Sequence, residues 1–133
     1  LGSMTAVDLN CTIFLAQVSH RLEHINQFVR RVRAGEEPSR MVPLWNLRAL
    51  REESAEIGCS HIPDVCRQIE KWITELPPQA DGIPQESLSA MLSASACIRE
   101  CAGRFSRGML EAGAPASVSA VKAVFPASGG EER

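Results

Sequence analysis

Aromatic side chains are scarce in this sequence, which has four Phe, two Trp and no Tyr among 133 residues. It has no apolar run long enough to span a bilayer and no signal-peptide pattern, so neither membrane insertion nor secretion is expected. The formal net charge of −2 provides no strong attraction to nucleic acid or to a membrane surface. The length suits one domain with a modest core. Because neither membrane insertion nor secretion is expected, we expect this domain to be cytoplasmic.

The five cysteines match neither a disulfide framework nor a metal site. Their number is odd and none of them forms a C-x-x-C pair, so we expect reduced thiols that mostly fill the core. Cys59, His61 and Cys66 are close in the sequence, but their spacing is not a standard zinc pattern. A phosphate-binding glycine loop, a Ser-His-Asp set and internal repeats are also missing. We therefore expect no metal, no cofactor and no enzymatic activity.

Apolar residues recur at three- and four-residue spacing in four segments, which is typical of amphipathic helices. The expected helices cover about 5–34, a segment from 41–43 to 57, 61–76, and a segment from 84 to 108 or 113. The connections are short and contain Gly or Pro, which favours antiparallel neighbours. The sequence therefore predicts an all-α fold, an antiparallel up-down four-helix bundle.

The second of these segments carries the most specific expectations. Trp45 is predicted to be a partly buried wedge between helices, and Ser60 to cap the helix that follows. The residues predicted to face the core are Leu44, Leu47, Leu50, Ser54 and Ile57.

The two ends of the chain are expected to lie outside the bundle. Residues 1–4 read as a cloning scar and a start Met, and residues 5–110 as the helical bundle. Residues 111–133 are rich in Ala, Ser and Gly, so this tail is expected to be partly disordered. Within it, the segment from Ala116 to Phe125 is compatible with a short fifth helix.

The stretch from Arg48 to Gly58 resembles the histidine-containing phosphotransfer (Hpt) domain, in particular the first domain of chemotaxis-type histidine kinases. The family pattern there is His-x-Leu-Lys-Gly, followed by an apolar residue and Gly six positions on. Leu50 matches the Leu, Arg51 matches the Lys, and Ile57-Gly58 match the closing pair. The phosphorylated His of the pattern falls on Arg48, and its small Gly falls on Glu52.

The resemblance also implies a carboxylate beside the acceptor position. In the family, a Glu twenty-two positions after the phosphoacceptor accepts a hydrogen bond from its imidazole, and that position is Glu70 here. A guanidinium can pair with a carboxylate through two parallel bonds, so we predict an Arg48–Glu70 ion pair between the second and third helices. The predicted partner-binding face consists of Arg48, Arg51, Glu52, Ala55, Arg67 and Glu70.

What the resemblance implies about function follows from its two departures from the pattern. Arg48 stays protonated and has no free lone pair with which to attack phosphorus. Glu52 adds negative charge where the acidic pocket of a receiver domain would dock. The resemblance thus implies a degenerate Hpt domain, a non-catalytic docking or regulatory module in bacterial two-component or chemotaxis-type signal transduction. Its partners would be a response-regulator receiver domain, a histidine kinase domain or a second copy of the chain.

Two alternatives stay open. The first is an active phosphotransfer protein that uses His20 or His61. The segment from Phe14 to His20 resembles the phosphoacceptor box of sensor kinases, Phe-Leu-Ala-x-x-Ser-His, although Arg21 stands where that family has an acidic residue. The second alternative is a plain helical protein–protein interaction or oligomerisation domain, which predicts neither Arg48–Glu70 proximity nor binding to receiver domains.

Overall fold

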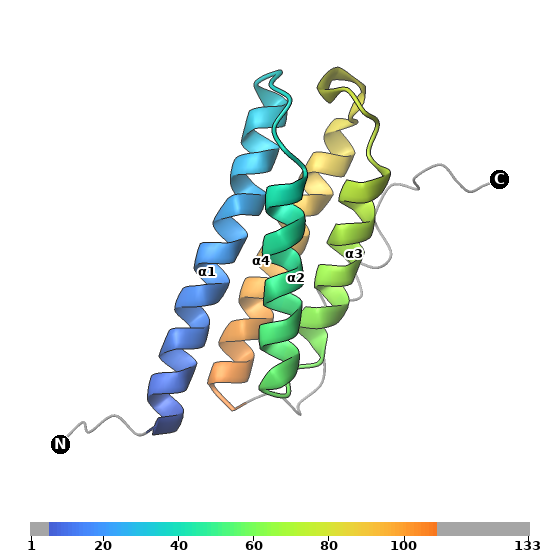
Figure 1. The fold of residues 1–133 in the computed structure, drawn as a ribbon. Helices are drawn as coiled ribbons and strands as arrows, with labels where there is room; N and C mark the ends of the chain where they lie inside the picture. The colour runs from blue at the N-terminus through green and yellow to red at the C-terminus, as the bar shows by residue number, and fades with distance from the viewer. Residues whose placement is uncertain (1–5, 109–133) are drawn as a thin grey trace.

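The computed structural model of the chain describes residues 6–108 as four α-helices and one short 3-10 turn, η1 (Figure 1). No strand occurs within these residues, and consecutive helices run in opposite directions (Figure 1). The prediction of an all-α, antiparallel four-helix bundle is therefore confirmed. The elements are α1 at Ala6–Arg33, α2 at Met41–Glu56, α3 at His61–Glu75, η1 at Ala80–Gly82 and α4 at Gln85–Ser106.

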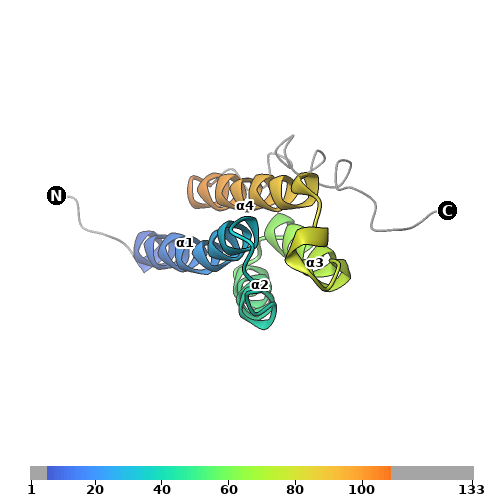
Figure 2. The same ribbon diagram turned by 90° about the horizontal axis from the view of Figure 1, so that it is seen from above.

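The four helices stand at the corners of a quadrilateral, with α2 diagonally opposite α4 (Figure 2). α1 and α3 each pack against both α2 and α4, whereas within residues 6–108 α2 and α4 do not contact each other. α2 is thus held from two sides, and the described chain leaves its outer side uncovered.

One apolar core fills the space between the helices, and the periodic stripes of the sequence form it. α3 shows this best, because every residue of its predicted stripe is buried. These residues are Ile62, Val65, Cys66, Ile69, Ile73 and Leu76. Trp72 on the same helix is also buried, with 2% of its surface exposed.

Two predictions about the core of α2 are wrong. Ile57 is 43% exposed, because α2 ends at Glu56 and the helical periodicity no longer applies at the cap. Trp45 is 61% exposed, because it lies on the outer side of α2, away from both neighbouring helices. Leu47, Leu50 and Ser54 are buried as predicted.

Ser60 occupies the predicted N-cap of α3, but its side chain makes no capping hydrogen bond. Its backbone has φ −93° and ψ −25°, a helical conformation, whereas a capping hydroxyl normally requires an extended one. The scar at residues 1–4, the tail at 111–133 and the suggested fifth helix lie outside the described residues.

Gly58 ends the turn after α2 with a φ of +91°, a conformation that side chains with a Cβ rarely adopt. Its amide donates to the carbonyl of Ala55, and no atom lies within 4 Å of where a Cβ would stand. Gly58→Ala is therefore expected to destabilise the protein by about 1 kcal/mol through backbone strain alone.

Gly103 provides the matched control, because it lies inside α4 with an ordinary φ. Its Cβ would meet only the end of the flexible Arg107 side chain, at 3.3 Å. Gly103→Ala is expected to stabilise the protein by about 0.5–1 kcal/mol. Urea unfolding of both variants checks the opposite signs, and an equal effect of the two would contradict the assignment of strain to Gly58.

Candidate functional site

The six residues predicted to form the partner-binding face lie on α2 and α3, two helices that pack against each other. Arg48, Glu52 and Ala55 are exposed on α2, and Arg67 is exposed on α3. Arg51 and Glu70 are half-buried between the two helices. The fold therefore places all six on one side of the bundle, but at different depths.

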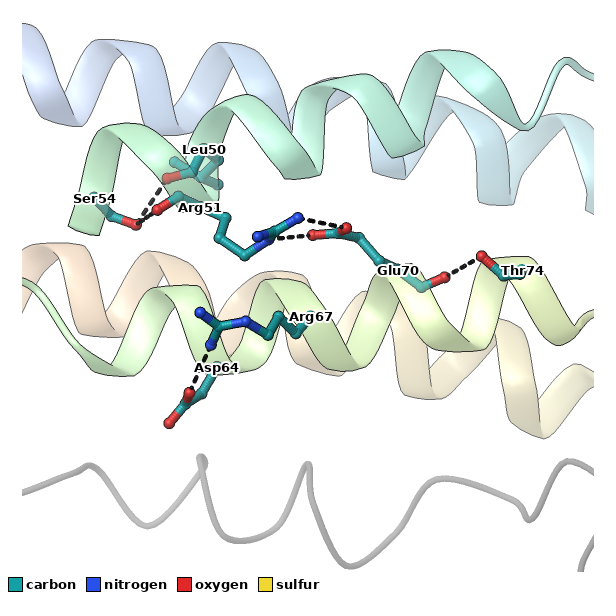
Figure 3. A network of polar contacts seen from close by, with 7 residues as sticks. All are labelled: Leu50, Arg51, Ser54, Asp64, Arg67, Glu70 and Thr74. Carbon is teal, nitrogen blue, oxygen red and sulfur yellow. Dashed lines mark hydrogen bonds and ion pairs between the residues drawn. The ribbon is translucent and has the colours of Figure 1, made fainter. Parts of the chain in front are cut away.

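Arg51 and Glu70 form a two-bonded ion pair across α2 and α3 (Figure 3). The Nε of Arg51 donates to Oε2 of Glu70 at 2.9 Å, and its Nη2 donates to Oε1 at 3.1 Å. Only 24% and 20% of the two side chains are exposed. The hydrogen bond from the guanidinium to the Glu70 carboxylate raises the pKa of Arg51, although burial opposes that rise. Both carboxylate oxygens of Glu70 are thus already engaged by one partner.

The predicted Arg48–Glu70 ion pair is therefore wrong, since Glu70 is paired with Arg51. Arg48 is exposed, and no hydrogen bond or ion pair joins it to any residue between 6 and 108. The two arginines are three positions apart on α2, which turns them about 60° apart around the helix axis. That rotation directs Arg51 into the groove toward α3 and leaves Arg48 on the outer side.

The outer side of α2 carries a continuous exposed row, which we name the α2 ridge. Its residues are spaced alternately by four and three positions and so share one face of the helix. Arg48 and Glu52 are four positions apart in this row, yet no ion pair joins them in the described structure. A basic residue N-terminal to an acidic one is the less favourable order for such a pair. The α2 ridge consists of Met41, Trp45, Arg48, Glu52 and Ala55.

An open hollow of about 360 Å³ lies beside the C-terminal end of the α2 ridge. We name it the Ala55 hollow, and Pro63 and Arg67 of α3 form its other wall. Arg67 donates to Oδ1 of Asp64 at 3.1 Å within α3 (Figure 3). The hollow is thus lined by small residues and by the paired charges of Asp64 and Arg67. Its lining residues are Ala55, Gly58, Cys59, Ser60, Pro63, Asp64 and Arg67.

The three histidines lie on α1 and α3, not on α2 with Arg48. His20 is exposed on α1 and meets His24 edge to face, with ring centroids 5.2 Å apart. His61 is half-buried at the first residue of α3. Arg21, the cation that follows His20 in the sequence, is bound to Glu53 of α2.

Several contacts between helices were not predicted from the sequence. Arg21 donates to both carboxylate oxygens of Glu53, with the shorter bond at 2.6 Å, and to Asn46 at 3.3 Å. Arg40, which precedes α2, donates to the backbone carbonyls of Leu76 and Pro77 at the end of α3. No local pattern marks these pairs, because their partners are 25 to 37 positions apart in the sequence.

The cysteines are all free thiols, and Cys11 alone among them is not buried. Burial raises the pKa of the Cys66 thiol, and a hydrogen bond that the Cys101 thiol donates to Cys97, together with burial, raises the pKa of Cys101. Such thiols are poor nucleophiles and poor metal ligands. Within residues 6–108, no group of three or more His, Cys, Asp or Glu side chains is placed to hold a metal ion.

None of the four described helices is both long and apolar enough to cross a membrane. Comparison of the chain with protein-family models, with curated proteins and with solved structures gives no match. The resemblance to Hpt domains therefore rests on the residues of α2 and α3 alone.

Proposed function

We propose that this chain is a non-catalytic docking module, a degenerate Hpt domain whose binding face lies on α2 and α3. It would act in cytoplasmic two-component or chemotaxis-type signalling and bind a receiver domain or a histidine kinase domain. The observation that carries the proposal is the exposed Arg48 in the middle of α2, next to the Arg51–Glu70 pair. The acceptor-equivalent position is thus accessible to a partner, but it bears a guanidinium that cannot attack phosphorus.

The Arg51–Glu70 pair adds a third departure from a working phosphotransfer site. In the Hpt register, Glu70 is the carboxylate that would orient the acceptor imidazole. Both of its oxygens are instead bound by Arg51, at 2.9 and 3.1 Å. A lysine, which the family has at this position, is a point charge and would leave one oxygen available. Glu70 is therefore held in a structural ion pair, at the position where the Hpt family has the carboxylate that orients the acceptor imidazole.

A plain helical interaction domain is the second candidate, and two observations favour it. The Arg48–Glu70 pair that the Hpt register predicted is absent. The exposed Trp45 on α2 is a contact residue of a kind that any interaction domain could use.

Phosphate transfer from a phosphorylated receiver domain tests the register. In a competent site, an imidazole nitrogen forms a bond to phosphorus as the bond from phosphorus to the donor aspartate oxygen breaks. We expect no uptake by the wild-type chain and measurable uptake by Arg48→His/Glu52→Gly. Adding Arg51→Lys is expected to increase the rate further, because one oxygen of Glu70 then becomes available to orient the imidazole.

Arg48→Gln/Glu52→Gly is the matched control, since it has the same small neighbour but no nucleophilic nitrogen. Uptake by the wild type that disappears in His20→Gln or His61→Gln would assign the activity to that histidine and refute the proposal. Absence of uptake in every variant would instead favour the plain interaction domain.

A further inference from the structure

The α2 ridge is the most exposed apolar feature of the described chain. Trp45 is 61% exposed and Met41 is 48% exposed, one helical turn apart. The described structure has six exposed large hydrophobic residues, and four of them belong to α2 or its cap: Met41, Val42, Trp45 and Ile57. An exposed indole costs solvation free energy, and tryptophan is the residue type most enriched at the centres of protein interfaces.

We propose that the α2 ridge binds the α2 ridge of a second copy of this chain, with the two helices antiparallel across a two-fold axis. The inference rests on the proposed function only in taking the outer side of α2 as a docking surface, and it names one partner for that surface. It does not depend on the resemblance to Hpt domains.

Charge complementarity favours a second copy as the partner and an antiparallel arrangement of the two α2 helices. If the two-fold axis passes midway between Arg48 and Glu52, each Arg48 faces Glu52 of the other copy, so two ion pairs form. A parallel arrangement would instead place Arg48 opposite Arg48 and Glu52 opposite Glu52, and like charges at an interface oppose association. A self-complementary patch is what a two-fold interface requires.

Arg21 and Arg51, the neighbouring arginines, are bound to other carboxylates, although Arg51 also attracts Glu52 and Glu56 is exposed near the end of α2. On one side of the α2 ridge Arg21 is paired with Glu53, and on the other Arg51 is paired with Glu70. Arg48 and Glu52 are the charges of the ridge that no described residue binds. The second copy would supply a partner for both.

The same two-fold axis also places a large side chain opposite a small one. Trp45 and Ala55 are ten positions apart, about 15 Å along the helix, and they are equally far from the axis on opposite sides. Trp45 of one copy therefore lies opposite Ala55 of the other, beside the Ala55 hollow of about 360 Å³. The hollow offers the small Ala55 and the guanidinium of Arg67 to the indole, while Arg67 is bound to Asp64 and Pro63 is buried. A cation beside an indole face adds attraction.

Sedimentation equilibrium of the full chain measures this association. The concentration range is roughly 1–500 μM, because a contact between two single helices buries little surface and is expected to be weak. We expect a monomer–dimer equilibrium in the wild type. Trp45→Ala is expected to weaken it by at least about tenfold. Ile13→Ala removes another exposed apolar side chain, 46% exposed on α1, and is expected to leave it unchanged. Circular dichroism checks that each variant remains helical.

Charge reversal tests the register. Arg48→Glu and Glu52→Arg each place two like-charged pairs across the axis, so each variant alone is expected to dimerise at least about tenfold more weakly. The double variant Arg48→Glu/Glu52→Arg restores opposite charges and is expected to recover most of the affinity. An equimolar mixture of the two single variants is expected to form heterodimers for the same reason.

A wild-type chain that stays monomeric throughout this range overturns the proposal. So does a dimer that Trp45→Ala leaves intact, or a double variant as weak as the single ones. A monomer that binds a phosphorylated receiver domain through Arg48 would assign the face to that partner instead. These results are independent of the phosphate-uptake assay, so failure of the dimer and failure of the proposed function can be told apart.

Discussion

Replacing Trp72 with alanine is expected to lower the free energy of unfolding by about 3–5 kcal/mol. Trp72 lies on α3 with 2% of its surface exposed, inside the core that all four helices form. Removing the indole takes away its transfer free energy and leaves a cavity that close-packed neighbours fill only in part. For a domain of this size, that loss is a large fraction of the whole stability.

Trp45 is the matched control, because the chain contains only one other tryptophan and the two have opposite environments. Trp45→Ala is expected to change the free energy of unfolding by less than about 0.5 kcal/mol, since its indole is largely exposed. Urea unfolding followed by circular dichroism at low protein concentration measures both without interference from self-association. Similar losses for the two variants would contradict the difference in burial.

These two tryptophans also show what the sequence alone could and could not predict about the fold. The apolar periodicity predicted six core residues of α3 and its cap, because α3 contacts neighbours along a continuous stripe, but it did not predict the buried Trp72. In α2 the same argument predicted a partly buried Trp45. The side chain proved exposed because no described helix covers that side of α2. Periodicity identifies a helix face, but it does not say how many neighbours that helix has.

The same distinction applies to the candidate site. The resemblance selected residues of α2 and α3 that do lie on one side of the bundle, and it identified Glu70 as an ion-pair acceptor. It assigned the wrong arginine. Arg48 and Arg51 lie within one turn of each other on α2, and the sequence does not determine which of them points toward α3. The Arg21–Glu53 pair could not be found at all, since its two residues are 32 positions apart.

The rotation of α2 makes a sharp prediction about the two arginines. Arg51→Ala is expected to destabilise the protein by about 1–3 kcal/mol, because it leaves the half-buried Glu70 carboxylate without its two hydrogen bonds. Arg48→Ala is expected to change stability by less than about 0.5 kcal/mol, because its side chain is exposed and has no bonding partner among residues 6–108. Chemical unfolding at pH 7 measures both.

A double-mutant cycle isolates the pair itself. Arg51→Ala combined with Glu70→Ala is expected to give a coupling energy of about 1–2 kcal/mol, whereas Arg48→Ala combined with Glu70→Ala is expected to give about zero. The pairing raises the pKa of Arg51, so its contribution is fully present below the ordinary arginine pKa and is lost only as pH rises through the raised value. The Arg51 coupling should therefore be the same at pH 6 and pH 9. A larger coupling for Arg48 than for Arg51 would restore the ion pair that the Hpt register predicts.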